Sequence, residues 1–240
     1  MNKSDYEIKS FNFNSAFRNA GSLSNPSFIL NESINNCVGV KVKNAVIPLS
    51  FYTFDTYNNK LYLVEDTNDV VEVSIPIGNY TSSTISSALK TALELAGSGT
   101  YTVSYSVLTN KINIQCATQF KFLSGSNDAY NELGITNEDV NAFSTNFTPS
   151  EVVDFSGVKT IHLVSNIGAT KCVNQNYNIL CSVITEEDNL SISSYEDNSA
   201  DYINIKNSQI SDFQISLYDE RFRQLKPYKD FSLTVYFLVE

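Results

Sequence analysis

The sequence predicts an all-β protein, built as a two-sheet β-sandwich that carries one amphipathic helix. At least eight segments alternate apolar and polar side chains, which is the pattern of a strand with one buried face. Only residues 82–96 show sustained helical spacing. Polar, turn-rich stretches separate the segments, and composition does not shift sharply anywhere along the chain. Many short strands in one continuous run favour a sandwich over an α/β fold.

The first half of the chain contains the clearest hairpin. Tyr101, Val103 and Tyr105 alternate with polar residues, residues 108–111 form a turn, and Ile112 and Ile114 alternate on the returning strand. The strands predicted here cover residues 36–47, 69–76, 101–107, 112–116 and 119–122, with two short pieces near 50–54 and 60–64. Residues 124–148 form loops, with a helical turn expected near 128–133.

The helix predicted at residues 82–96 has one apolar face. Ile85, Leu89 and Leu93 recur at helical spacing, and the hydroxyl side chains at 81–84 offer N-caps. Gly97 follows as a C-cap. We expect the apolar face to pack onto the sandwich or across one of its ends.

The last third of the chain returns to strands. They are predicted at residues 160–165, 178–184, 201–206, 212–218 and 231–239. The final strand alternates throughout, with Leu233, Val235 and Phe237 on one face. A terminal strand with such regular alternation is expected inside a sheet, and we expect it to pair with the strand at 36–47.

Residues 1–34 are predicted to form an N-terminal arm, and residues 35–240 a single domain. The arm is rich in Asn and Ser and shows no sustained period. Its four phenylalanines, Phe11, Phe13, Phe17 and Phe28, are costly to leave in water. We therefore expect part of the arm to be ordered by packing on its own sandwich or on an adjacent subunit.

Charge and hydropathy exclude several functional classes. The 240 residues carry a formal net charge of −10, which disfavours binding to nucleic acid and to anionic membranes. No stretch approaches the length of a transmembrane helix, and no signal peptide is visible at the start. The four cysteines lack C-x-x-C spacing, so we interpret them as reduced thiols.

Few residues are candidates for catalysis. His162, the only histidine, could act as a general base or metal ligand, but strand alternation favours a polar residue on a half-exposed face. Cys172 and Cys181 flank a polar loop, and one of them could pair with His162 as a nucleophile. Cys181 is more simply a buried strand residue.

Two acidic clusters, residues 65–69 and 186–188, could hold a hard cation, although neither has EF-hand spacing. We interpret both as solvated loop charges. The sequence also lacks a phosphate-binding loop and the common hydrolase motifs. We therefore predict no catalytic residues, no bound cofactor and no metal site, and expect the protein not to be an enzyme.

Two stretches of the chain resemble a known family. The motifs in the first are AVIPLSFY at 45–52, IPIGNYT at 75–81, the helix, the 101–114 hairpin and LGI at 133–135. Those in the second are IHLVSN at 161–166, IL at 179–180, YE at 195–196, ISDFQISLYD at 210–219 and FSL at 231–233. Their order and spacing are similar to those of the penton, or minor capsid, proteins of virophages, Polinton-like viruses and related large DNA viruses. The resemblance covers about residues 36–240.

The resemblance implies a single jelly roll and a structural role in the virion. Five identical copies would close each five-fold vertex of an icosahedral capsid, beside double-jelly-roll major capsid proteins. It implies assembly in the infected cell, with no direct contact to nucleic acid, no membrane insertion and no catalytic residues.

Two other hypotheses remain open at the level of sequence. A carbohydrate-binding or host-attachment β-sandwich would need a concave groove of exposed Tyr or Phe side chains. An enzyme on a jelly-roll scaffold, such as a cupin, would need more metal ligands than one histidine supplies.

Overall fold

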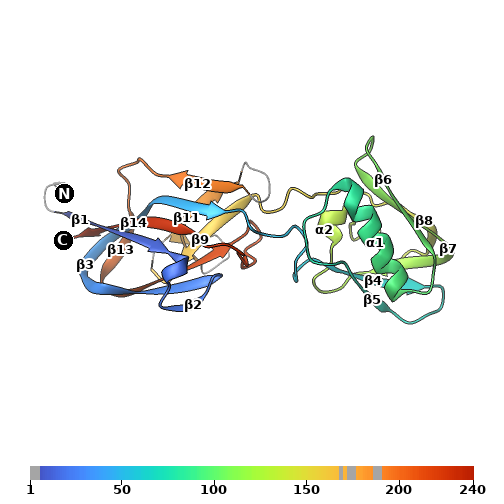
Figure 1. The fold of residues 1–240 in the computed structure, drawn as a ribbon, viewed down its shortest axis with the longest axis horizontal. Coiled ribbons are helices and arrows are strands. Elements are labelled where there is room, and N and C mark those ends of the chain that lie inside the picture. The colour runs from blue at the N-terminus through green and yellow to red at the C-terminus, as the bar shows by residue number, and fades with distance from the viewer. Residues whose placement is uncertain (1–5, 168–169, 172–176, 186–190) are drawn as a thin grey trace. The chain divides into compact units, whose positions relative to one another are not determined.

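The computed structural model describes residues 6–167, 170–171, 177–185 and 191–240, and the chain forms two compact units (Figure 1). Unit 1 comprises Met1–Phe51 and Val158–Glu240, and unit 2 comprises Tyr52–Gly157. Each unit has its own hydrophobic core. The chain is mostly β, with two antiparallel sheets and one main helix, which confirms the predicted all-β jelly-roll class.

The described part of unit 1 contains nine strands. They are β1 (Glu7–Asn14), β2 (Ala20–Ser22), β3 (Asn25–Pro48), β9 (Thr160–Ser165), β10 (Thr170–Lys171), β11 (Asn178–Ile184), β12 (Ile192–Glu196), β13 (Ile203–Tyr218) and β14 (Ser232–Val239). The main path of the sheet is β1-β14-β3-β13-β9-β11-β10, and both β2 and β12 pair with β3. Segments from both ends of the chain therefore alternate within one sheet.

The two ends of the predicted sandwich pair as expected. Val235 of β14 lies opposite Val42 of β3, and Phe237 lies opposite Val40. All four side chains are buried in the core of unit 1. The register shifts several times where β13 pairs with β3. Such bulges bend and twist a strand, and this allows one long sheet to curve around a single core.

The N-terminal segment differs from the predicted arm. Residues 7–14 form β1, which pairs with β14 over its whole length, and β3 begins at Asn25 rather than near residue 36. Phe13 and Phe28 are buried, and their ring centroids lie 5.1 Å apart. Phe11 also packs against this core, whereas Phe17 is 80% exposed. Part of the segment is thus ordered by packing as expected, but strands β1, β2 and β3 place it inside the sheet of unit 1. The boundaries of the two units fall elsewhere, after Phe51 and before Val158.

Unit 2 is built from a continuous stretch of sequence. Its elements are β4 (Lys60–Glu65), β5 (Val71–Ser74), α1 (Ser82–Ala96), β6 (Tyr101–Ser106), β7 (Lys111–Leu123), α2 (Tyr130–Leu133) and β8 (Ser144–Phe147). The sheet order is β5-β4-β7-β6, with β8 added on β7. The predicted hairpin forms between β6 and β7, where Val103 lies opposite Ile114.

Helix α1 has the predicted bounds, and its caps explain them. The Thr81 hydroxyl accepts a hydrogen bond from the Thr84 backbone N–H, and the Thr84 hydroxyl accepts one from the Thr81 N–H, forming a capping box. Ile85, Leu89 and Leu93 are fully buried, as predicted. They belong to the core of unit 2, so the helix packs on the five-stranded sheet of that unit.

Within the described residues, no helix is both long enough and apolar enough to cross a membrane.

Candidate functional site: a tyrosine-lined groove on unit 1

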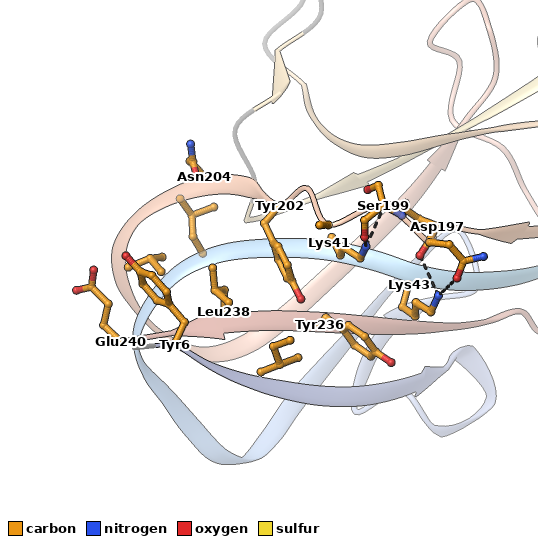
Figure 2. A pocket seen from close by; sticks show the side chains of 15 residues that line it. Tyr6, Lys41, Lys43, Asp197, Ser199, Tyr202, Asn204, Tyr236, Leu238 and Glu240 are labelled. Atoms are coloured by element: carbon orange, nitrogen blue, oxygen red, sulfur yellow. Dashed lines mark hydrogen bonds and ion pairs between the residues drawn. The ribbon is translucent and has the colours of Figure 1, made fainter. Parts of the chain in front are cut away.

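A groove of about 770 Å³ lies on the outer face of the unit 1 sheet (Figure 2). It is lined by apolar and aromatic side chains from β1, β14 and β13 and by charged side chains from β3 and from the β12–β13 loop. Among the lining residues are Tyr6, Ile8, Tyr202, Tyr236 and Leu238. We call this surface the tyrosine groove.

The pairing register explains why these side chains meet. Tyr236 lies opposite Ser10 on one side and Lys41 on the other, and Leu238 lies opposite Ile8 and Gly39. Directly paired residues share a face of a sheet, so this row points away from the core. Gly39 has no side chain to fill the row, and a Cβ there would lie 3.1 Å from the Tyr202 Cβ. Tyr202 and Leu238 therefore pack closely over Gly39, where a larger residue would force them apart.

Two lysines of β3 form the polar wall of the tyrosine groove. Lys41 Nζ donates a 2.6 Å hydrogen bond to the Ser199 carbonyl and lies 3.5 Å from Asp197 Oδ2. Lys43 Nζ donates to the Asp197 carbonyl at 3.0 Å and lies 3.3 Å from Glu196 Oε1. The end of β12 and the loop after it therefore neutralise both lysines.

The ionisation of the groove is set by these contacts. The Ser199 backbone N–H donates to Asp197 Oδ1 at 2.7 Å, and this bond, aided by the Ser199 side chain and Lys41, lowers the pKa of Asp197. Burial raises the pKa of Tyr202, and the neighbouring Tyr236 and Asp197 add to the rise. At neutral pH the Asp197 carboxylate is charged and the Tyr202 phenol is neutral. Lys41 Nζ also lies 5.5 Å from the Tyr202 ring centroid.

The structure places His162 on β9, where its ring stacks on Phe222 with centroids 4.8 Å apart. Its Nδ1 lies 2.7 Å from the Ser182 hydroxyl of the paired strand β11. Burial lowers the pKa of His162, although Asp219 and Glu220 oppose the shift. The side chain is half-exposed on the strand face, as alternation predicts.

Cys181 lies on β11 and packs against the core of unit 1. Burial raises the pKa of its thiol to about 12, so the thiolate is not formed at neutral pH. The side chain is partly buried rather than fully buried. Cys172 lies outside the described residues, and so does the acidic cluster at 186–188.

Glu65, from the other acidic cluster, is not a solvated loop charge as predicted. It is 4% exposed in the core of unit 2. Its carboxylate accepts hydrogen bonds from the Ser98 N–H at 2.7 Å, the Gly99 N–H at 2.9 Å and the Tyr101 hydroxyl at 2.6 Å. Burial alone would raise the pKa of Glu65, but these bonds and the Ser98 hydroxyl outweigh it and hold the pKa at about 2.

The same carboxylate explains two glycines. A Cβ on Gly97 would lie 2.5 Å from Glu65 Oε1, and one on Gly99 would lie 2.9 Å from the same oxygen and 2.7 Å from Cys116 Sγ. Gly97 caps α1 as predicted, donating its N–H to the Leu93 carbonyl, but it does so without a positive φ. The glycine is required here by space rather than by backbone conformation.

Sequence reasoning did not locate the tyrosine groove. It identified the strand positions of Tyr236 and Leu238 but could not place Tyr6, Tyr202 and Lys41 beside them. The alternation of Tyr236 and Leu238 opposite buried Val235 and Phe237 was the available signal. Across the described ranges, no three His, Cys, Asp or Glu side chains form a cluster that could hold a metal ion.

Comparison with known proteins finds similarity among solved structures. The crystal structure of the selenomethionine-labelled mavirus penton protein aligns over 97% of this chain and 99% of its own, with 13% identity and a TM-score of 0.46. A chain of the Sputnik virophage structure, determined by cryo-EM, aligns over 96% of this chain and 97% of its own, with 14% identity and a TM-score of 0.41. No protein-family model and no curated protein matches the sequence. The first of these structures is a penton protein, and the second is that of a virophage.

Proposed function

We propose that this chain is a penton protein, a minor capsid protein whose homopentamers close the five-fold vertices of an icosahedral virion. The double-jelly-roll major capsid protein would surround each pentamer, and assembly would take place in the infected cell. The role is geometric and requires no catalysis. The order of motifs over residues 36–240 and the jelly-roll class support this proposal.

The observation that carries the proposal is a pair of unlike apolar patches on unit 1. The first, the Phe17 patch, consists of Phe17 and Ile29, which are 80% and 66% exposed and line a shared groove. The second, the Ile192 patch, consists of Val46, Ile184 and Ile192; Ile192 is 61% exposed. Exposed apolar clusters of this kind are typical of protein contacts.

Ile29 and Val46 both lie on β3, and β2 and β12, the short strands next to the two patches in the chain, pair along opposite edges of β3. Ser27 of β3 pairs with Ala20 of β2 on one edge and with Gln214 of β13 on the other. Gly39 pairs with both β13 and β14, and Val46 pairs with both β14 and β12. It follows that β2 and β14 pair along one edge of β3, whereas β12 and β13 pair along the opposite edge. A ring of identical subunits needs such different surfaces on its two sides, because each contact joins one side to the other.

The environment of His162 supports a role without catalysis. Its ring stacks on Phe222 and its Nδ1 contacts Ser182, so the imidazole has a structural setting in unit 1.

Two variants, each with a charge in one of the two patches, test whether these patches join the subunits of a pentamer. Phe17→Asp and Ile192→Asp each place a charge in one patch, and each should reduce a pentamer of the parent protein to monomer in sedimentation velocity. Because each variant keeps the patch that the other has lost, an equimolar mixture should form a heterodimer and no larger ring. Leu108→Asp, at an exposed residue of unit 2, is the matched control and should remain pentameric. A parent protein that stays monomeric at every concentration would contradict the homopentamer.

A further inference from the structure

We propose that the tyrosine groove binds a neutral carbohydrate. The groove is distinct from the Phe17 and Ile192 patches, so the inference does not depend on pentamer formation. Its volume of about 770 Å³ is within the range of about 300–1,000 Å³ that is typical of small-molecule sites. It combines aromatic side chains and fixed polar groups on one face of the sheet (Figure 2).

The aromatic side chains provide surfaces for the apolar face of a sugar ring. Tyr6, Tyr202 and Tyr236 are each half-buried, and they come from three separate segments that converge on the groove. Figure 2 shows Tyr202 and Tyr236 projecting from neighbouring segments on the same side of the sheet as Lys41 and Lys43. A pyranose ring has an apolar C–H face and a rim of hydroxyl groups, and tyrosine offers the matching combination of an apolar ring and a polar tip.

The charges of the groove favour a neutral ligand. Lys41 is paired with Asp197, and Lys43 is paired with Glu196. The exposed Glu240 adds a negative charge to the lining. An anionic sugar would have to compete with these carboxylates for the lysines, whereas a neutral sugar leaves both ion pairs in place.

The polar wall also disfavours an apolar occupant. Lys43 Nζ already uses its three donors on Glu196 Oε1, the Asp197 carbonyl and Asn198 Oδ1. The remaining hydrogen-bonding capacity lies on the Asp197 carboxylate, which accepts about four bonds, and on the Lys41 ammonium group, which donates three and contacts Ser199 and Asp197. An apolar side chain laid over them would remove water from these groups and return no hydrogen bonds, which is unfavourable. Sugar hydroxyls both donate to a carboxylate and accept from an ammonium group, so they replace the water that they displace.

Saturation-transfer NMR on the full chain tests the site. The probes are the methyl glycosides of glucose, galactose, mannose and N-acetylglucosamine, with 3′-sialyllactose as the anionic comparison. We expect at least one neutral glycoside to receive saturation through its ring protons, and to bind more tightly than the sialylated probe. Titration then gives Kd for the glycoside that responds best.

Three variants locate the binding. Tyr236→Ala should weaken that glycoside about tenfold, which corresponds to about 1.4 kcal/mol, whereas Tyr236→Phe, which keeps the ring, should stay within about threefold. Tyr228→Ala removes an exposed tyrosine of unit 1 outside the groove and should leave Kd unchanged. Thermal melts of all variants check that the fold is retained.

Several results would overturn the proposal. One is the absence of saturation transfer to every neutral glycoside. Another is equal weakening by Tyr236→Ala and Tyr228→Ala. If no glycoside binds and Tyr236→Ala instead lowers the sedimentation coefficient, the groove is a contact between copies of the chain. A penton that forms rings without binding sugar would refute this inference alone, and a sugar-binding monomer would refute only the proposed ring.

Discussion

Units 1 and 2 are both rich in β-strands, but unit 1 pairs strands from the two ends of the chain, whereas unit 2 pairs strands that are close in sequence. The sheet of unit 1 pairs residue 7 with residue 239, so its core closes only when both ends of the chain have met. Unit 2 uses one continuous stretch, with a local hairpin and a helix that packs on the sheet beside it. Contacts between distant residues carry a larger loop-closure cost. We infer that unit 2 can fold alone, whereas unit 1 depends on its terminal strands.

The largest expected effect comes from removing β1. Deleting residues 1–14 exposes the edge of β14 and removes Phe11 and Phe13 from the core of unit 1. We expect unit 1 to lose about 5 kcal/mol or more, enough to unfold it, because each buried Phe contributes roughly 1.5–3 kcal/mol before the lost strand pairing is counted. Hydrogen exchange followed by mass spectrometry should show lost protection in unit 1, while unit 2 stays folded and protected.

The matched control changes the other face of β1. Ser10→Ala combined with Asn12→Ala leaves the buried phenylalanines in place and should cost less than about 1 kcal/mol. Retained protection of β14 in the deletion variant would mean that the N-terminal segment is an appendage after all.

A single charge in the core of unit 2 should unfold unit 2 and leave unit 1 folded, the reverse of the result expected for the β1 deletion. Leu89→Asp places a carboxylate in the core of unit 2, where Leu89 is fully buried, and should cost several kcal/mol. Exchange protection should then be lost in unit 2 while unit 1 stays folded, since its core contains no residue of unit 2. Simultaneous loss in both units would show that they unfold as one body.

Glu65 gives unit 2 an acid sensitivity that can be measured. Its pKa of about 2 lies below its ordinary value of 4.5, so its contribution is complete above pH 4.5 and is lost as the pH falls towards 2. The shift corresponds to about 3 kcal/mol. The free energy of unfolding of excised unit 2, residues 52–157, measured with urea, should therefore fall as the pH is lowered from 4.5 towards 2.

Two glutamine variants separate this effect from general acid denaturation. Glu65→Gln should cost about 3 kcal/mol at pH 7, because an amide cannot accept all the bonds from Ser98, Gly99 and Tyr101, and should flatten the pH dependence. Glu72→Gln alters an exposed ion pair with Lys60 in the same sheet and should cost less than about 1 kcal/mol. Equal costs would mean that Glu65 is not buried as described.

The smallest effect is expected in unit 1, at His162. The pKa of His162 is lowered from 6.5, so the folded state disfavours its protonated form and loses stability as the pH falls below 6.5. His162→Gln should change stability by about 1 kcal/mol or less at pH 7.5 and should reduce the loss between pH 7.5 and 5.5. A metal-dependent or hydrolytic activity that disappears in this variant would contradict the structural role.

Sequence reasoning succeeded where structure is local. Helix 82–96, the hairpin at 101–116 and the alternation of the last strand follow from patterns within a few residues. Strand β1 was missed because only Phe11 and Phe13 alternate clearly, and its stability comes from β14 at the other end of the chain. Strand propensity depends strongly on such partners.

The site-level predictions had the same limit. The run of acidic residues at 65–69 forms an exposed turn from Asp66 onward, so the prediction is wrong only for the first residue. Burial of Glu65 depends on donors from residues 98–101. Likewise, the tyrosine groove brings together Tyr6, Tyr202 and Tyr236 from three separate segments of the chain, which no local pattern encodes.

The point of insertion has a consequence for chain entropy. Unit 2 begins and ends at the same place in its own fold, since the rings of Phe54 and Phe155 lie 6.1 Å apart. While unit 2 is folded, it therefore acts for unit 1 as a short connection between Phe51 and Val158. If unit 2 unfolds, that connection becomes a free loop of about 100 residues, and closing it costs unit 1 about 2 kcal/mol more than a loop of about 10 residues would. Folding of unit 2 thus lowers the loop-closure cost of unit 1. A ligand that stabilises either unit will therefore raise the stability of the other without contacting it.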